Sequence, residues 1–182
     1  MIATAVTLFQ RQGYRATTWR GLVREADAPW GSVQHHFPGG KQQLAVAAVE
    51  LGGTVVREAI VACQQDGAPP DAIRAWFELS AALLEASSYE GGCPIAAVAL
   101  ETASDAPAIA AACEAAMASW VEAIADNLRG ARLDEARAGD LAVLAVAAFE
   151  GAVMIARLQR STTPLLRTAD LIADEVERAI GS

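Results

Sequence analysis

Polar side chains between positions 30 and 41 are of types that could bind nucleic acid. The segment 30–37 reads WGSVQHHF, and the spacing of Val33 and Phe37 puts both on the inner face of a short helix. The side chains that then face outward are Ser32, Gln34, His35 and His36. Glutamine can form two hydrogen bonds with adenine, and serine can bond base edges or phosphates. This helix therefore has the chemistry for contact with bases.

Two further polar residues are expected at helix starts. Thr17 or Thr18 can cap the helix that precedes this segment, and Lys41 begins the helix that follows it. Free N–H groups and the helix dipole favour an anion at a helix N-terminus. Thr18 and Lys41 are therefore well placed to bind phosphates.

The elements that must position these side chains are two short helices joined by a turn. The first helix has its apolar positions at Trp19, Leu22, Val23 and Ala26. The sequence 27–29 (DAP) interrupts it, because proline cannot continue a helix but fits the first turn of the next one. This layout is typical of the helix-turn-helix, whose second helix lies in the major groove. The spacing alone leaves an ordinary helical hairpin equally open.

The remaining segments also favour helix, which predicts an all-α fold. Alanine, the best helix former and a residue depleted in strands, occurs 42 times. Glycine and proline mark the breaks, among them 66–70 and 38–40. Nine helices are expected: one ending at Gly13, then 17–26, 29–36, 41–65, 71–88, 94–104, 105–129, 134–160 and, with Thr163 as its N-cap, 163–181.

Charge and composition favour a cytoplasmic protein with two dissimilar parts. The net charge is −8, yet residues 1–50 carry five basic and three acidic groups, so the negative charge lies in the rest of the chain. The longest apolar stretch, 141–156, is cut by Glu150 and is short for a membrane span, and no signal peptide is expected. The three cysteines match no disulfide framework or zinc signature. Adjacent histidines point about 100° apart on a helix and lack a third ligand, so neither a metal nor a cofactor is expected.

Longer patterns resemble a known family. Positions 8–18 (LFQRQGYRATT) and 31–44 (GSVQHHFPGGKQQL) look like the N-terminal domain of TetR/AcrR-family transcriptional repressors. The sequences GCPIA at 92–96, ALE at 99–101 and FEGA at 149–152 resemble one branch of that family. The resemblance implies a homodimer with a helix-turn-helix DNA-binding domain at 1–45. It also implies an effector-binding and dimerisation domain at 46–182, where a small molecule releases the operator DNA.

The resemblance also shows where this sequence departs from the family. Trp30 stands where a basic residue is frequent, and Gln34 stands where tyrosine is common, so the operator sequence should differ. A basic stretch usually precedes the first helix, and Met1 lies almost on that helix, which predicts a longer natural N-terminus. The residues expected to contact DNA are Thr18, Trp30, Ser32, Gln34, His35, His36 and Lys41.

Aromatic and sulfur-containing side chains of the C-terminal part are candidates for an effector pocket. The set is Trp76, Phe77, Cys93, Ala97, Met117, Trp120, Ile124, Phe149 and Met154. The abundant alanines leave space between crossing helices, so a mostly apolar, aromatic effector is expected there. Each of these residues taken singly is more typical of plain core, whereas as a set some of them should line a cavity between helices. Gly151, in the middle of a helix, suggests the close approach of another helix or a ligand.

Two small-residue or apolar stripes predict a dimer through the last two helices. The stripe on 134–160 consists of Ala142, Ala145, Ala148, Ala152 and Ala156, and that on 163–181 of Leu165, Ala169, Ile172, Val176 and Ala179. The sequence leaves two alternative functions. A redox-responsive regulator would use Cys93, which begins a helix. An all-α enzyme has little support, because the sequence offers neither a Ser/His/Asp set nor a glycine-rich phosphate loop.

Overall fold

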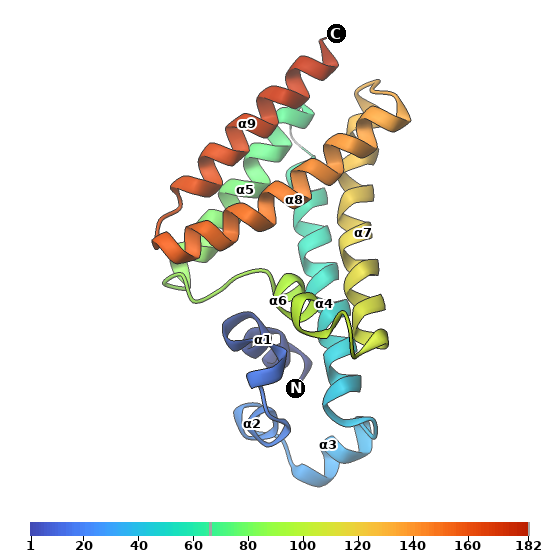
Figure 1. The fold of residues 1–182 in the computed structure, drawn as a ribbon, viewed down its shortest axis with the longest axis vertical. Coiled ribbons are helices and arrows are strands. Elements are labelled where there is room, and N and C mark those ends of the chain that lie inside the picture. Colours follow the sequence, from blue (N-terminus) through green and yellow to red (C-terminus); the bar gives the residue numbers. More distant parts are fainter. Residues whose placement is uncertain (66, 182) are drawn as a thin grey trace. The chain divides into compact units, whose positions relative to one another are not determined.

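The computed structural model describes residues 1–65 and 67–181, and within them the chain forms nine α-helices and no strand (Figure 1). The expected all-α, nine-helix fold is confirmed. The helices are α1 (Ile2–Ala16), α2 (Trp19–Glu25), α3 (Trp30–His36), α4 (Gly40–Cys63), α5 (Pro69–Ala86), α6 (Pro94–Thr102), α7 (Pro107–Gly130), α8 (Glu135–Gln159) and α9 (Thr163–Ile180).

Several helix boundaries differ from the expectation by one to three residues. Gly13 interrupts α1 with φ 80° and ψ 172°, but the chain resumes a helical turn after it and ends α1 at Ala16. The N-cap of α9 is Thr162 rather than Thr163, and its side chain makes no capping hydrogen bond. Instead, the N–H of Thr163 donates to Ser161 Oγ at 3.3 Å. Of the predicted break at 66–70, Asp66 lies outside the described residues, and α5 already begins at Pro69.

The helices divide into two packing units. The first unit comprises Met1–Thr54 with Cys93–Ala116, and the second comprises Val55–Gly92 with Met117–Ser182. Helices α4 and α7 each contribute residues to both units. Helix α6, which the sequence assigned to a domain at 46–182, packs together with the N-terminal helices in the first unit. The functional boundary between residues 45 and 46 stays a prediction.

The first unit is held together by apolar faces at helical spacing. Helix α1 packs mainly on α6, and Ala5 and Phe9 form the buried face of α1. Ile95 and Val98 are the buried residues of the facing helix α6 that have large side chains. Leu22 on α2 is also fully buried, so each short helix is fixed by only one or two side chains.

The second unit has an aromatic core. Helix α9 packs on both α5 and α8. The rings of Trp76 and Phe149 stack with centroids 4.2 Å apart, and Phe77 meets Phe149 edge-to-face at 5.2 Å. Offset and edge-to-face pairs of this kind stabilise a core beyond the burial of their area.

Most side chains of the stripes expected to form a dimer are buried in this core. On α9, Leu165, Ala169, Ile172 and Val176 are buried within the chain itself. On α8, Ala142, Ala145, Ala152 and Ala156 are buried in the same way. The interpretation of these stripes as an intersubunit surface was therefore wrong, because the face with the strongest helical periodicity packs against helices of the same chain.

Two helices are long and apolar enough to cross a membrane by length and composition. They are α7 and α8, with mean hydropathies of 1.4 and 2.0 over their most apolar windows. No such segment is expected from the uninterrupted apolar stretches of the sequence, which are shorter than a membrane span. About two fifths of each window is buried inside the protein (39% and 44%), and core helices of soluble proteins pass the same test.

Candidate DNA-binding interface

Helix α2 begins and ends with specific capping contacts. Thr18 is its N-cap, and the Thr18 side chain accepts a hydrogen bond from the N–H of Gly21 at 3.1 Å. At the other end Asp27 adopts φ 47°, a left-handed conformation that aspartate tolerates better than most residues. The N–H of Ala28 then donates to the carbonyl of Val23, and that of Asp27 to the carbonyl of Arg24. This Schellman pattern makes the tight turn before α3.

Helix α3 presents nearly all of its side chains to solvent. Val33 is its buried residue, and Phe37, directly after it, is half-buried. Ser32, Gln34, His35 and His36 are exposed, as the spacing predicted, and Trp30 is exposed as well. The imidazoles of His35 and His36 lie edge-to-face with centroids 5.5 Å apart. The fold thus leaves the polar tips of α3 available to a partner.

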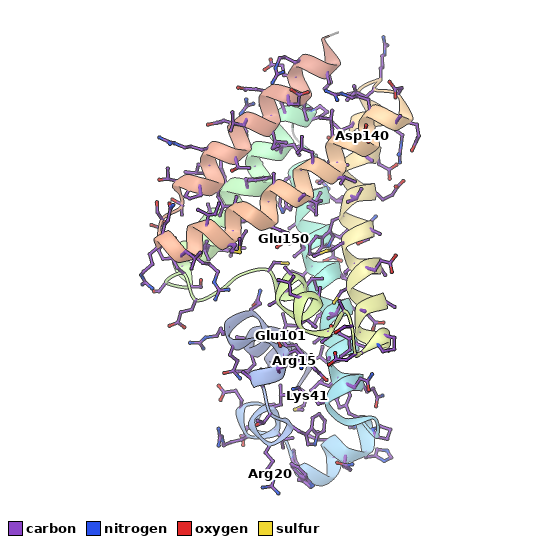
Figure 2. The ribbon with its side chains drawn as sticks, in the orientation of Figure 1. Arg15, Arg20, Lys41, Glu101, Asp140 and Glu150 are labelled. Atoms are coloured by element: carbon purple, nitrogen blue, oxygen red, sulfur yellow. The ribbon has the colours of Figure 1, made fainter. Side chains whose placement is uncertain are left out.

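Lys41 lies in the first turn of α4. Gly40, just before it, has φ 64°, which glycine adopts without strain, and the N–H of Gly39 donates to Gln43 Oε1 at 2.9 Å. The Lys41 ammonium lies 3.9 Å from the centroid of the Tyr14 ring. Burial lowers the pKa of Lys41, and the negative charge of Glu101 acts in the opposite direction. Figure 2 labels Lys41 together with Arg15 and Glu101.

An open hollow of about 640 Å³ lies between α2 and the start of α3. Its lining includes Arg20 and Arg24 on α2 and the indole of Trp30, which is 51% exposed. The two arginines are not among the site residues predicted from the sequence. Their spacing of four residues, which places them on one helical face, was a signal that could have identified them. Two cations beside a recognition helix are suited to phosphate contacts.

Comparison with known proteins gives the family. The N-terminal residues 1–48 match the model of the bacterial regulatory proteins of the tetR family, and residues 69–171 match the LmrA/YxaF-like C-terminal domain of transcriptional regulators. The HTH-type transcriptional regulator LmrA of Bacillus subtilis (strain 168) is 30% identical over 179 residues, which cover 98% of this chain and 95% of LmrA. The chain belongs to the TetR family.

Solved structures agree with this assignment. A TetR regulatory protein from Rhodobacter sphaeroides superimposes with a TM-score of 0.86 at 19% identity, covering 95% of each chain. A TetR transcriptional regulator from Chloroflexus aurantiacus J-10-fl is 28% identical, with a TM-score of 0.81 over 97% of this chain and 91% of that one. The TetR-family relatives are transcriptional regulators and not enzymes, and this chain is accordingly a DNA-binding transcriptional regulator.

The expected effector residues of this TetR-family chain fall into separate groups. Trp76, Phe77 and Phe149 form the aromatic cluster of the second unit, and Trp120 is fully buried in the same unit. Trp76 and Ile124 line one small cavity of about 10 Å³, together with Ile60, Ile73 and Leu128 among others. A space of this size holds about one water molecule. The rings are therefore packed against one another in this form of the protein.

Four other members of the set lie elsewhere. Met154 is 60% exposed on the surface of α8, and Met117 is half-buried on α7. Cys93 and Ala97 belong to the first unit. Cys93 is the N-cap of α6, where its Sγ accepts a hydrogen bond from the N–H of Ala96 at 3.4 Å. This contact gives Cys93 a capping role, and the redox role weighed against it stays a prediction.

Proposed function

We propose that this TetR-family protein is a repressor that binds a near-palindromic operator through α3 and leaves it when a small, mostly apolar effector binds. The observation that carries the DNA-reading part is the surface of α3. Its polar residues are exposed while a single inward valine fixes the helix. Selection of bound fragments from a random DNA pool tests it. Enrichment of one inverted repeat supports the proposal, and recovery of unrelated sequences contradicts it.

Dimerisation is proposed through faces of α8 and α9 other than the buried stripes. Exposed apolar side chains recur along one side of α8 and on α9, and such a surface is typical of an interface. They are Val143, Leu144, Met154, Ile155 and Leu158 on α8, and Leu166 and Leu171 on α9. A Cβ added at Gly151 would meet no atom of this chain within 4 Å, so the close approach expected there would come from a partner helix.

A pair of leucines allows a matched test of the dimer. Leu158 on α8 is 80% exposed, and Leu100 on α6 is 86% exposed. Leu158→Glu should convert the protein to a monomer in sedimentation velocity at micromolar concentration, whereas Leu100→Glu should leave the dimer intact. A wild-type protein that sediments as a monomer contradicts the proposal. A two-fold dimer would place its two α3 helices in major-groove segments about 34–36 Å apart, or a multiple of that distance.

The effector is proposed to enter the aromatic core of the second unit. The cavity beside Trp76 and Ile124 supports this position, because its lining is mostly apolar and it leaves a space among the core side chains. Since the cavity holds about one water molecule, the effector must displace side chains there. It therefore stabilises an expanded conformation. A shift of the DNA-binding population from 99% to 1% needs a preference of about 5.5 kcal/mol for that conformation.

Enlarging the cavity tests the effector site. Ile124→Ala removes three heavy atoms from its wall and should lower the concentration of a small aromatic probe, such as indole, that releases the operator. Ile180→Ala, at the more exposed end of α9, serves as the control and should not change that concentration. The proposed site is wrong if the same indole concentration releases wild-type protein and Ile124→Ala from the operator. It is also wrong if no indole concentration releases either protein.

A further inference from the structure

Glu101, the last residue of the ALE sequence on α6, joins this helix to the end of α1. Its Oε2 accepts a hydrogen bond from the backbone N–H of Arg15 at 2.5 Å. The carbonyl oxygen of Glu101 accepts two more, from Nε and Nη2 of Arg15, at 3.1 and 2.9 Å. Each residue therefore bonds the main chain of the other with its side chain, although they lie 86 positions apart in the sequence.

Both contacts satisfy backbone groups at helix ends. The break at Gly13 takes the N–H of Arg15 out of the helical ladder, and the Glu101 carboxylate supplies its acceptor. Helix α6 ends at Thr102, so the carbonyl of Glu101 is among the last four of that helix, which lack intrahelical partners. A guanidinium is also the favourable charge at this negative end of the helix dipole.

Gly13 gives the carboxylate access to this position. A Cβ at Gly13 would collide with Oε1 of Glu101, and the φ of +80° is strained for any residue with a side chain. The hydroxyl of Thr17 donates to the carbonyl of Gly13 at 2.7 Å, which holds the kink from the other side. We call Gly13, Arg15 and Glu101 the α1–α6 junction.

The junction lies next to a residue expected to bind phosphate. Tyr14, between Gly13 and Arg15, carries the ring under the Lys41 ammonium. Glu101 is also close enough for its charge to act on Lys41. Arg15, Glu101 and Lys41 are labelled together in the first unit in Figure 2. Tyr14 and Glu101 thus link the start of α4 to the end of α1.

We propose that Glu101 is a positioning residue for DNA binding, which fixes the kink of α1 and through Tyr14 the place of Lys41 relative to α3. This inference rests on the DNA-reading role proposed for α3. Simple electrostatics gives the opposite expectation, because a carboxylate in a DNA-binding unit repels phosphates and its removal should tighten binding. Loss of the charge alone should tighten binding to all DNA alike and leave the preference for the operator unchanged, so a fall in that preference separates positioning from charge.

Two variants with the same change in charge isolate the hydrogen bond. Glu101→Ala removes the acceptor of the Arg15 N–H, whereas Glu101→Gln keeps an acceptor oxygen and loses only the charge. Glu114→Ala removes an exposed carboxylate from α7 of the same unit and is the charge control. Gly13→Ala disrupts the junction on α1, because the added Cβ would collide with the Glu101 carboxylate. It leaves the net charge unchanged.

The readout is the ratio of two affinities at low temperature. One is for the operator selected by the wild-type protein, and the other is for a random-sequence duplex of equal length. Glu101→Ala should lower this ratio about tenfold, the order expected for the loss of one charge-assisted hydrogen bond, because a misplaced Lys41 would hold the phosphates out of register with α3. Gly13→Ala should lower it as well. Glu101→Gln should stay within about threefold of the wild type, and Glu114→Ala should not lower the ratio.

Three results would overturn the inference. An unchanged ratio in Glu101→Ala shows that the junction does not position the DNA-binding residues. An equal loss in Glu101→Ala and Glu101→Gln shows that the charge, not the acceptor, matters. A wild-type protein with no preferred sequence contradicts the proposed function itself and this inference with it. Circular dichroism of each variant at the same temperature confirms that the folded protein is being compared.

Discussion

Helix α3 and the aromatic cluster of the second unit use their side chains in opposite ways. On α3 the fold buries Val33 and leaves the polar residues in solvent. In the cluster, Trp76, Phe77 and Phe149 are nearly or fully buried and contact one another. Side chains that the fold does not need are free to recognise a partner, whereas the cluster first of all stabilises the chain. A set of aromatic residues in the sequence therefore does not by itself identify a ligand pocket.

The sharpest test of this comparison is a truncation inside the cluster. Phe77→Ala should lower the free energy of unfolding by about 3–5 kcal/mol, because it leaves a cavity under two other rings. Urea denaturation measures the change. Leu83→Ala, on the same helix but largely exposed, should cost less than about 0.5 kcal/mol. Similar losses in the two variants would mean that the cluster does not carry the core.

The corresponding change on α3 should affect recognition and not stability. Gln34→Ala should cost about 1–3 kcal/mol in discrimination at one base pair of each half-site. Competition binding with operators mutated at single positions measures this loss. Gln65→Ala, an exposed glutamine far along the chain, is the control. If Gln34→Ala keeps the wild-type preference at every position, α3 does not read that base through Gln34.

Thr18 caps α2 and is also predicted to contact phosphate, so its variants sharpen the boundary between stability and recognition. Thr18→Ala removes the acceptor for the Gly21 N–H and should lower the free energy of unfolding by about 1 kcal/mol. Thr18→Ser keeps the hydroxyl and should have the free energy of unfolding of the wild type. Thermal unfolding of the three proteins tests this. A fully stable Thr18→Ala variant would show that the cap does not matter to α2.

The smallest expected effect is on the salt dependence of binding. Lys41→Ala should weaken binding to all sequences alike and reduce the slope of log affinity against log salt by about one unit. Fluorescence anisotropy over a salt series measures the slope. Arg57→Ala removes an exposed cation elsewhere on α4 and should leave the slope unchanged. A normal slope in Lys41→Ala would remove this lysine from the phosphate contacts.

Local signals accounted for the secondary structure and the exposure of α3. The four-residue spacing of Val33 and Phe37 predicted which side of α3 faces inward. The sequence offered Thr17 or Thr18 as the cap of α2, and in the structure the cap is Thr18. Proline and glycine placed most helix ends within one or two residues. These signals succeed because they depend on residues at most one turn apart. The DNA contacts of the exposed residues and the effector site stay predictions.

The sequence patterns did not predict correctly which helices pack against one another, and the reason is physical. The apolar stripe on α9 showed that one face is buried, but periodicity carries no information on which helix covers it. The tertiary structure placed that stripe against α5 and α8 of the same chain, and left Leu166 and Leu171 exposed instead.

The sequence by itself determined the nine helices found in the described residues, the turn between α2 and α3, and the exposure of the polar side of α3. Each of these follows from short-range sterics, capping and periodicity, and the family motifs add the class of function. Only the tertiary structure decided that α6 packs with the N-terminal helices and that Glu101 caps the kink at Gly13. A contact between residues 86 positions apart depends on how the helices meet, and that is set by the packing of many side chains together rather than by any local pattern.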